Sequence, residues 1–188
     1  MWSDEMTKAK NGILLLLVLV ALIWFVRAID SFDNDGVSVA GMGIIPRHVS
    51  GLSGILVAPL VHADWDHLLA NTVPLLILGI VIAMRGPEEL IFVILVTMLT
   101  SGLGAWLFGR TAQHIGASGV VLGFMSFLIV RSIYDHRLSS FLISIAVAVV
   151  YAGSVVFALA PREFFSWTMH FFGLVGGALA AKWRYSRH

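Results

Sequence analysis

The sequence predicts an all-α polytopic membrane protein, a bundle of six transmembrane helices with both termini in the cytoplasm. Of the 188 residues, 59% are hydrophobic and 12% are charged, whereas a soluble domain is typically about 45–50% apolar and about 25% charged. The mean hydropathy is +0.92. The charged residues gather in short clusters, and the apolar runs between them are long enough to cross a bilayer.

The spans follow from apolar runs bounded by charged residues and helix breakers, since a helix needs about 20 residues to cross the hydrocarbon core. The first run follows Lys8 and Lys10, as a signal peptide would. It ends in Arg27 without a small-residue cleavage site, so we expect it to be a span. The six predicted spans are residues 11–29, 66–84, 88–109, 117–134, 139–159 and 167–184.

The distribution of Lys and Arg orients these spans, because cytoplasmic loops carry an excess of both. With the N-terminus inside, eight basic residues lie in inner segments and four in outer ones, which favours cytoplasmic termini. The inner set is Lys8, Lys10, Arg85, Arg131, Arg137, Lys182, Arg184 and Arg187. The outer set is Arg27, Arg47, Arg110 and Arg162.

The single long connection is the outer loop 30–65, which begins acidic and ends in the apolar stretch GLSGILVAPLV. That stretch is too short to span, so we expect it to lie in the interface or to re-enter partway. No repeat of fixed period is present, and residues 1–188 are expected to form one membrane domain.

Composition also argues against several classes of function. The chain has no cysteine, which excludes disulfides, thiolate catalysis and Cys-bound metal. A formal net charge of +1 and the lack of a dense Lys/Arg stripe give no indication of nucleic-acid binding. No charged residue falls near a span's midplane and no inverted halves are apparent, so a transporter is disfavoured.

Polar side chains within the spans are functional candidates, because burying them in lipid is costly. The second span carries His67 and Asn71, four residues apart and therefore on one helical face. The fourth span begins at Ser118, and the sixth carries His170 near its outer end. At about 1.5 Å per residue, all four lie within roughly 10 Å of the outer helix ends.

This set of residues predicts acyl-transfer chemistry. A serine hydroxyl becomes nucleophilic when a base removes its proton, and neutral imidazole titrates in the right range. The developing negative charge needs preorganised donors, which an Asn amide, a second His and the Ser118 backbone N–H could supply. That N–H is available because the first amides of a helix have no partner within it.

Glycines at spacing four support close approach of the fourth and sixth spans. Gly119 and Gly123 form one pair, and Gly173 and Gly177 form another three residues after His170. Small residues at this spacing let helix backbones approach closely, as a bond between Ser118 and His170 would require.

Each residue also has a plainer interpretation. Ser118 is well suited to be a helix N-cap, and His170 could be a buried histidine bonded to a backbone carbonyl. His67 and Asn71 could satisfy helix ends, and GxxxG pairs are common in membrane helices. The histidines in loops or at chain ends, which are His62, His114, His136 and His188, are expected to be mostly solvated.

The motifs together resemble the rhomboid family of intramembrane serine proteases. They are His62 followed by HLLAN (67–71), GASG (116–119) and HFFGLVGG (170–177), on the expected spans and in the expected order. The resemblance implies a dyad of Ser118 as nucleophile and His170 as general base and acid. It implies an oxyanion site at His67, Asn71 and the Ser118 amide, with His62, Gly116, Gly119, Gly173 and Gly177 in supporting roles.

Two positions depart from the family pattern. Many members carry a tyrosine four residues after the serine, stacked on the histidine, where this chain has Leu122. Phe171, Phe172 or Phe124 are candidates to compensate for that ring. Members also often carry a Trp-Arg pair in the first outer loop, which is missing here, and Arg47 is a candidate for a related task.

The leading hypothesis is an intramembrane serine endopeptidase of a bacterial plasma membrane, with transmembrane proteins as substrates and no cofactor or metal. We expect a polar cavity open to the outside, closed sideways by helices and capped by the loop Ala160 to Ser166. The alternative is a catalytically silent relative that binds membrane clients. A histidine-ligated haem or metal protein is a third class, disfavoured because no second histidine pair lies at the inner depth and HExxH is absent.

Overall fold

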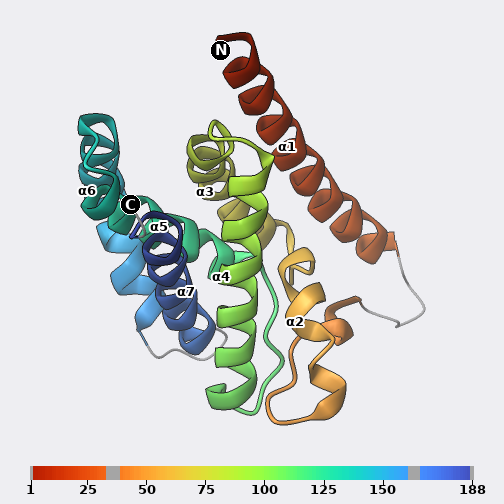
Figure 1. Ribbon diagram of the computed structural model, residues 1–188. Coiled ribbons are helices and arrows are strands. Elements are labelled where there is room, and N and C mark those ends of the chain that lie inside the picture. Colours follow the sequence, from red (N-terminus) through yellow and green to blue (C-terminus); the bar gives the residue numbers. More distant parts are fainter. Residues whose placement is uncertain (1, 33–38, 161–165, 187–188) are drawn as a thin grey trace.

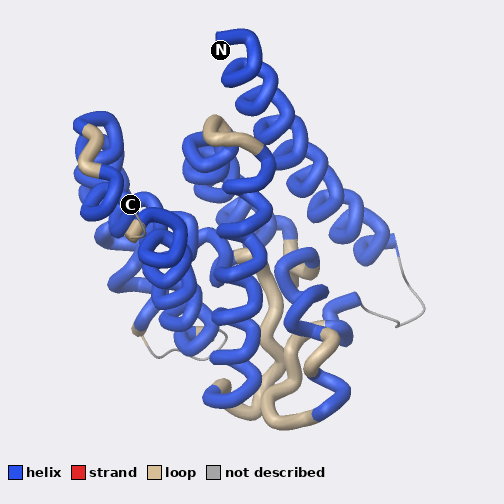
Figure 2. The backbone as a smooth tube through the Cα atoms, viewed as in Figure 1, coloured by secondary structure: helices blue, strands red, loops and turns tan. Residues whose placement is uncertain are grey.

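The computed structural model describes residues 2–32, 39–160 and 166–186, which form helices joined by loops (Figure 2). The long helices are α1 (Trp2–Phe32), α3 (Trp65–Ala83), α4 (Pro87–Phe108), α5 (Ser118–Asp135), α6 (Leu138–Leu159) and α7 (Trp167–Tyr185). The short ones are η1 (Val39–Met42), η2 (Val49–Gly51), α2 (Gly54–Val57) and η3 (Ala58–Leu60). The described part contains no strand, only an isolated bridge between Ile44 and His114. The predicted all-α class is confirmed.

Each of the six predicted spans corresponds to one long helix. The main difference is that α1 begins at Trp2 instead of residue 11, because the polar residues before the apolar run are compatible with a helix. Glu5 and Lys8 are good helix formers, and acidic Asp4 and Glu5 lie favourably in the first turn. The orientation of the termini stays a prediction from charge.

Within the described residues, five helices are long and apolar enough to cross a membrane, namely α1, α3, α4, α5 and α6. The helix α7 has 19 residues but carries His170 and, in its last turn, Lys182 and Arg184, which lower its hydropathy. It packs closely against α4 and α5. Its composition therefore fits a helix whose neighbours are mainly other helices.

The helix α5 is the centre of the bundle, and it packs against α3, α4, α6 and α7. Its side chains supply much of the buried core, including Phe124 and Phe127, neither of which is exposed. The helices α1 and α6 lie at opposite edges of the bundle (Figure 1). The first residue of α5, Ser118, therefore lies among other elements of the fold.

Glycines bring α5 and α7 into backbone contact. A Cβ atom at Gly173 would clash with the carbonyl oxygen of Gly119, and one at Gly177 would clash with the carbonyl oxygen of Gly123. The hydroxyl of Ser126 reinforces this contact by donating to the carbonyl of Leu174 across the interface, at 2.6 Å. Only residues without a side chain fit at this distance between the two helices.

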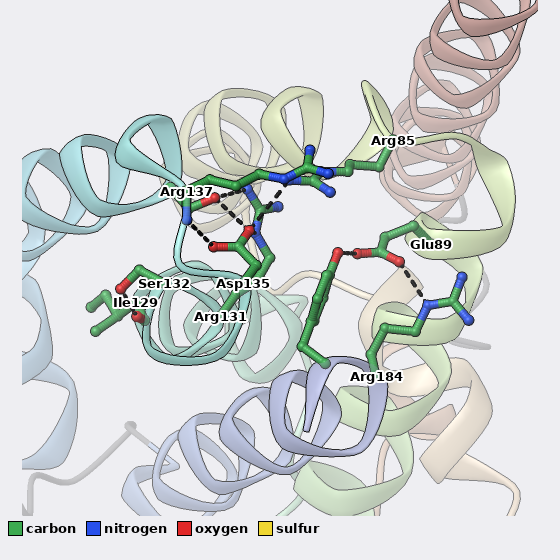
Figure 3. Close-up of polar contacts among 10 residues, drawn as sticks. Arg85, Glu89, Ile129, Arg131, Ser132, Asp135, Arg137 and Arg184 are labelled. Carbon is green, nitrogen blue, oxygen red and sulfur yellow. Dashed lines mark hydrogen bonds and ion pairs between the residues drawn. The ribbon is translucent and has the colours of Figure 1, made fainter. Parts of the chain in front are cut away.

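A network of ion pairs closes the opposite end of the bundle, about 27 Å from Ser118 given the 18 residues of α5. Asp135 pairs with Arg131 at 3.3 Å and with Arg85 at 3.4 Å. Glu89 pairs with Arg184 at 3.0 Å and accepts a hydrogen bond from Tyr185 (Figure 3). These contacts tie the turn before α4 and the first turn of α4 to the ends of α5 and α7.

The described part of the outer loop folds into η1, η2, α2 and η3 beside one end of α4 (Figure 1). Its apolar helical stretch Val49–Leu60 is too short to span, as expected. Arg47 Nη1 donates to the carbonyl of Gly109 at 2.8 Å, and Trp106 Nε1 donates to the carbonyl of His48 at 2.9 Å. An arginine and a tryptophan from separate elements therefore fasten this loop to the end of α4.

We predict that Gly177→Ala lowers the stability of the protein, because its methyl group would overlap the backbone of α5. Overpacking of this kind costs about 1–3 kcal/mol. The matched control is Gly153→Ala on α6, where an added Cβ meets no atom within 4 Å. The control should unfold at the wild-type temperature or slightly above it, because alanine is a better helix former. Thermal unfolding in detergent measures both, and equal melting temperatures would contradict the packing argument.

Candidate active site

The candidate site is built around the hydroxyl of Ser118, the first residue of α5. Its Oγ lies 2.8 Å from Nε2 of His170, in the first turns of α7. The N-cap position of α5 is taken by Ala117, whose side chain makes no capping bond. The serine hydroxyl is therefore directed at an imidazole, and the plainer expectation of a simple helix cap does not describe it.

The turn before Ser118 is held by hydrogen bonds to the segment that precedes α3. Gly116 has a φ of +105°, a conformation that L side chains rarely adopt. Its N–H donates to the carbonyl of Ala58 at 2.8 Å, and the N–H of Ala117 donates to Nε2 of His62 at 3.4 Å. A Cβ atom at Gly116 would lie 2.7 Å from Nε2 of His67, so glycine lets that ring approach the turn.

A backbone carbonyl fixes the tautomer of His170. Its Nδ1 lies 2.8 Å from the carbonyl oxygen of Ala158 on α6. A carbonyl oxygen can only accept, so Nδ1 carries the hydrogen. The neutral ring then has its lone pair on Nε2, the atom that faces Ser118. The carbonyl of Ala158 thus occupies the place of the acidic residue that orients histidine in a catalytic triad.

The site opens into a cavity of about 1260 Å³ formed by α3, α5, α6, α7 and the loop before α5. His67, Asn71, Ser118 and His170 all line it. Pro74 of α3 and Tyr151 of α6 also line the cavity; that it is open to the outside and closed sideways by helices stays a prediction. Of the expected cap, Ala160 to Ser166, residues 161–165 lie outside the described part of the chain.

Asn71 and His67 stand on one face of α3, next to the turn that carries Ser118. Asn71 Nδ2 donates to the carbonyl of His67 at 2.9 Å, which uses one of the two amide hydrogens. The ring of His67 packs edge-on against that of His62, with 5.0 Å between centroids. Asn71 and His67 therefore supply polar groups to the same cavity as Ser118.

Two loop histidines are buried, contrary to the expectation that they are solvated. His62 is 1% exposed and His114 is 2% exposed. His62 packs against His67 and the Ala117 amide, and the backbone of His114 pairs with Ile44 of the outer loop. Burial is the largest cause that lowers the pKa of His62, to about 4, and the charge of the nearby His67 is the second. The ring is therefore neutral at pH 7, which leaves Nε2 free to accept from the Ala117 amide. His136 is exposed as expected, and His188 lies outside the described residues.

The aromatic residues considered as replacements for the missing tyrosine have other contacts. Phe172 stacks on Phe108, with centroids 5.4 Å apart and planes 6° apart, and Phe171 packs edge-on against Phe172. Phe124 is fully buried in the bundle core. Leu122 itself lines the cavity. What the structure does supply to orient His170 is the Ala158 carbonyl, a backbone group that no sequence motif reveals.

The fold and the site define a multi-pass helical membrane protein with a serine and a histidine in contact inside a cavity. The family model of the Rhomboid domain matches residues 49–187. The chain therefore belongs to the rhomboid family, whose members are generally intramembrane serine proteases. Among the described residues, no three His, Asp or Glu side chains are grouped so as to hold a metal ion.

Similar proteins occur in mycobacteria. An uncharacterized protein of Mycobacterium tuberculosis and one of Mycobacterium bovis are each 35% identical over 175 residues, which cover 88% of this chain and 72% of the relative. An uncharacterized protein of Mycobacterium leprae is 33% identical over 175 residues, covering 88% of this chain and 68% of the relative. The similarity extends over nearly the whole bundle.

We predict that the protein loses stability as the pH falls from about 6.5 toward 4. In that range the unfolded chain protonates His62 while the folded state, with its pKa of about 4, does not. The unfolded state then binds more protons, so stability falls with falling pH. Melting temperatures between pH 4.5 and 7.5 measure the slope. His62→Gln should reduce it and exposed His136→Gln should leave it unchanged; identical slopes in all three would contradict the assignment.

Proposed function

We propose that this chain is an intramembrane serine endopeptidase that hydrolyses a peptide bond in or near a transmembrane segment of another membrane protein. The observation that carries the proposal is the 2.8 Å contact between Ser118 Oγ and His170 Nε2, with the ring held by Ala158 from its other side. The rhomboid family match and the cavity around the two residues support it.

In the proposed mechanism, His170 acts first as a general base. Its Nε2 takes the hydroxyl proton as Ser118 Oγ attacks the carbonyl carbon of the scissile bond. The Ala158 carbonyl accepts from Nδ1–H throughout, so the imidazolium keeps a hydrogen-bond partner at each nitrogen. This contact stabilises the charged ring less than a carboxylate would, because a carbonyl carries no full charge.

The oxyanion that develops on the substrate needs donors already in place. The N–H of Ser118 is the first amide of α5 and has no acceptor within the helix. The free amide hydrogen of Asn71 and the ring of His67 face the same cavity from α3. These three groups are the proposed oxyanion site.

His170 acts next as a general acid and then as a base again. The proton on Nε2 passes to the leaving amine as the C–N bond breaks, which leaves an acyl ester on Ser118. Water then attacks the ester carbonyl while Nε2 takes a proton from it, and the serine leaves with that proton. The cavity volume of about 1260 Å³ leaves room for both substrate backbone and water.

The proposed substrate is a transmembrane segment that can unwind near the site. A peptide bond inside a helix has both its polar groups bonded, and it must be exposed before a nucleophile can reach its carbonyl. We therefore expect helix-weakening residues near the cut and a small side chain just before it, the latter implied by the family. The mycobacterial relatives fit a bacterial plasma membrane as the location.

We predict that a fluorophosphonate probe labels the detergent-purified protein at Ser118. Ser118→Ala and His170→Ala should abolish labelling, because one removes the nucleophile and the other its base. The matched control is Ser154→Ala, since Ser154 lines the same cavity from α6 and has no part in the proposed chemistry. In-gel fluorescence measures the labelling, with circular dichroism to show that each variant is folded.

The same experiment separates the proposal from its alternative. Folded wild-type protein that takes up no label, in detergent and in lipid vesicles alike, would contradict a protease and favour a catalytically silent binder of membrane clients. Labelling that survives His170→Ala would contradict the role of that histidine as the base.

Asn71→Ala should weaken the enzyme without abolishing it. Removing one oxyanion donor typically costs about 10²–10³-fold in kcat, and the Ser118 amide would remain. Cleavage of a model transmembrane substrate in vesicles measures the rate. Asn11→Ala on the exposed face of α1 is the control and should cleave at the wild-type rate. An unchanged rate in Asn71→Ala would remove that residue from the proposed oxyanion site.

A further inference from the structure

His114 is a buried histidine that the proposed chemistry does not use. It lies in the loop before α5 and is 2% exposed. Its Nε2 is 3.1 Å from the carbonyl oxygen of Arg110, and its Nδ1 is 2.5 Å from the hydroxyl oxygen of Ser166. Both ring nitrogens are therefore engaged, one within the loop and the other at the start of α7.

The partners fix which nitrogen of His114 carries the hydrogen. The Arg110 carbonyl can only accept, so Nε2 is the donor and Nδ1 holds the lone pair. Ser166 must then donate its hydroxyl hydrogen to Nδ1, while its Oγ accepts from the N–H of Met169 at 3.4 Å. Burial lowers the pKa of His114, in keeping with a neutral ring that accepts at Nδ1.

Ser166 connects this ring to the catalytic histidine. It is the N-cap of α7, and its carbonyl accepts the backbone N–H of His170 at 3.1 Å. Arg110, His114, Ser166 and His170 are thus linked one to the next by hydrogen bonds, some through side chains and some through the backbone. The ring of His170 is in turn bonded to Ser118.

The ring of His114 has little freedom to move. Its own backbone exchanges two hydrogen bonds with Ile44, at 2.9 and 3.0 Å. A Cβ atom at Gly109 would lie 2.7 Å from Nε2 of His114, so a residue without a side chain makes space for the ring. The histidine is therefore a fixed point to which the first turn of α7 can be attached.

We propose that His114 is a positioning residue for the proposed reaction, which holds His170 opposite Ser118 by fixing Ser166 at the start of α7. The inference rests on the proposed function, because it assigns a task within the same site. The proposed role of His114 differs from a general packing role in one respect. The reaction needs the hydrogen-bond acceptor at Nδ1, so a side chain that only fills the space is insufficient.

The test compares His114→Leu, which fills the space without hydrogen bonds, with His114→Asn, whose amide oxygen can accept from Ser166 near the place of Nδ1. The rate of fluorophosphonate labelling of Ser118 is measured on folded protein, because it reports on the serine and its base. We expect His114→Leu to slow labelling about 10- to 100-fold, as small misplacements of catalytic groups do. His114→Asn should recover a large part of that loss, and exposed His136→Leu should label at the wild-type rate.

Ser166→Ala supplies the second half of the test. If both residues act through one bond, Ser166→Ala and His114→Leu should each slow labelling by a similar factor, and the double variant should be no slower than either. Each of three results would overturn the proposal. The first is that His114→Leu is labelled as fast as the wild type, and the second is that His114→Asn recovers no labelling rate. The third is that the two slowing factors multiply in the double variant.

Hydrogen exchange of the segment 166–172 separates this inference from the proposed function. Faster exchange there in His114→Leu, with an unlabelled wild type, would leave the anchoring of α7 in place and overturn the protease proposal. If the wild type is labelled and His114→Leu changes neither the exchange nor the labelling, the role of His114 is overturned and the protease proposal stands.

Discussion

The site depends on the backbone contact between α5 and α7. Ser118 and His170 stand at the first turns of these helices, and their hydrogen bond of 2.8 Å is made beside a contact in which the two backbones lie closer than ordinary side chains permit. Gly119 faces Gly173 in this contact, one residue after the serine and three after the histidine. In a bilayer, where lipid removes most of the hydrophobic driving force between helices, such close packing is a main source of association. The packing of α5 on α7 and the proposed catalytic geometry therefore depend on the same glycines.

The site orients its histidine without a carboxylate. An acid buried beside His170 would have to be desolvated, which costs several kcal/mol per ion even after relaxation. The Ala158 carbonyl avoids that cost and still fixes the tautomer, because it can only accept. His62 and His114 are likewise neutral hydrogen-bond acceptors. His62 accepts from the Ala117 amide and His114 accepts from the Ser166 hydroxyl.

Much of the fold was predictable because lipid restricts what can cross it. The six spans followed from apolar runs, and the shared depth of His67, Asn71, Ser118 and His170 followed from helix rise. What escaped prediction involves groups without a side-chain signature or contacts made by irregular loops. The Ala158 carbonyl carries no sequence signal, and the burial of His114 depends on how the outer loop folds over it. The pairing of Arg47 with the end of α4, and of Trp106 with the loop, likewise joins separate elements.

The hydrogen bond from His170 to the carbonyl of Ala158 links the position of α6 to the orientation of the His170 ring. α6 lies at the edge of the bundle (Figure 1), with few of its side chains buried, and its residues Tyr151 and Ser154 line the cavity. The bond from His170 Nδ1 holds only while the carbonyl stays near 2.8 Å; hydrogen bonds weaken steeply with distance and angle. A shift of about 1 Å in α6 would therefore break the hydrogen bond that orients the His170 ring. The position of α6 and the orientation of the proposed base are therefore coupled through one backbone oxygen.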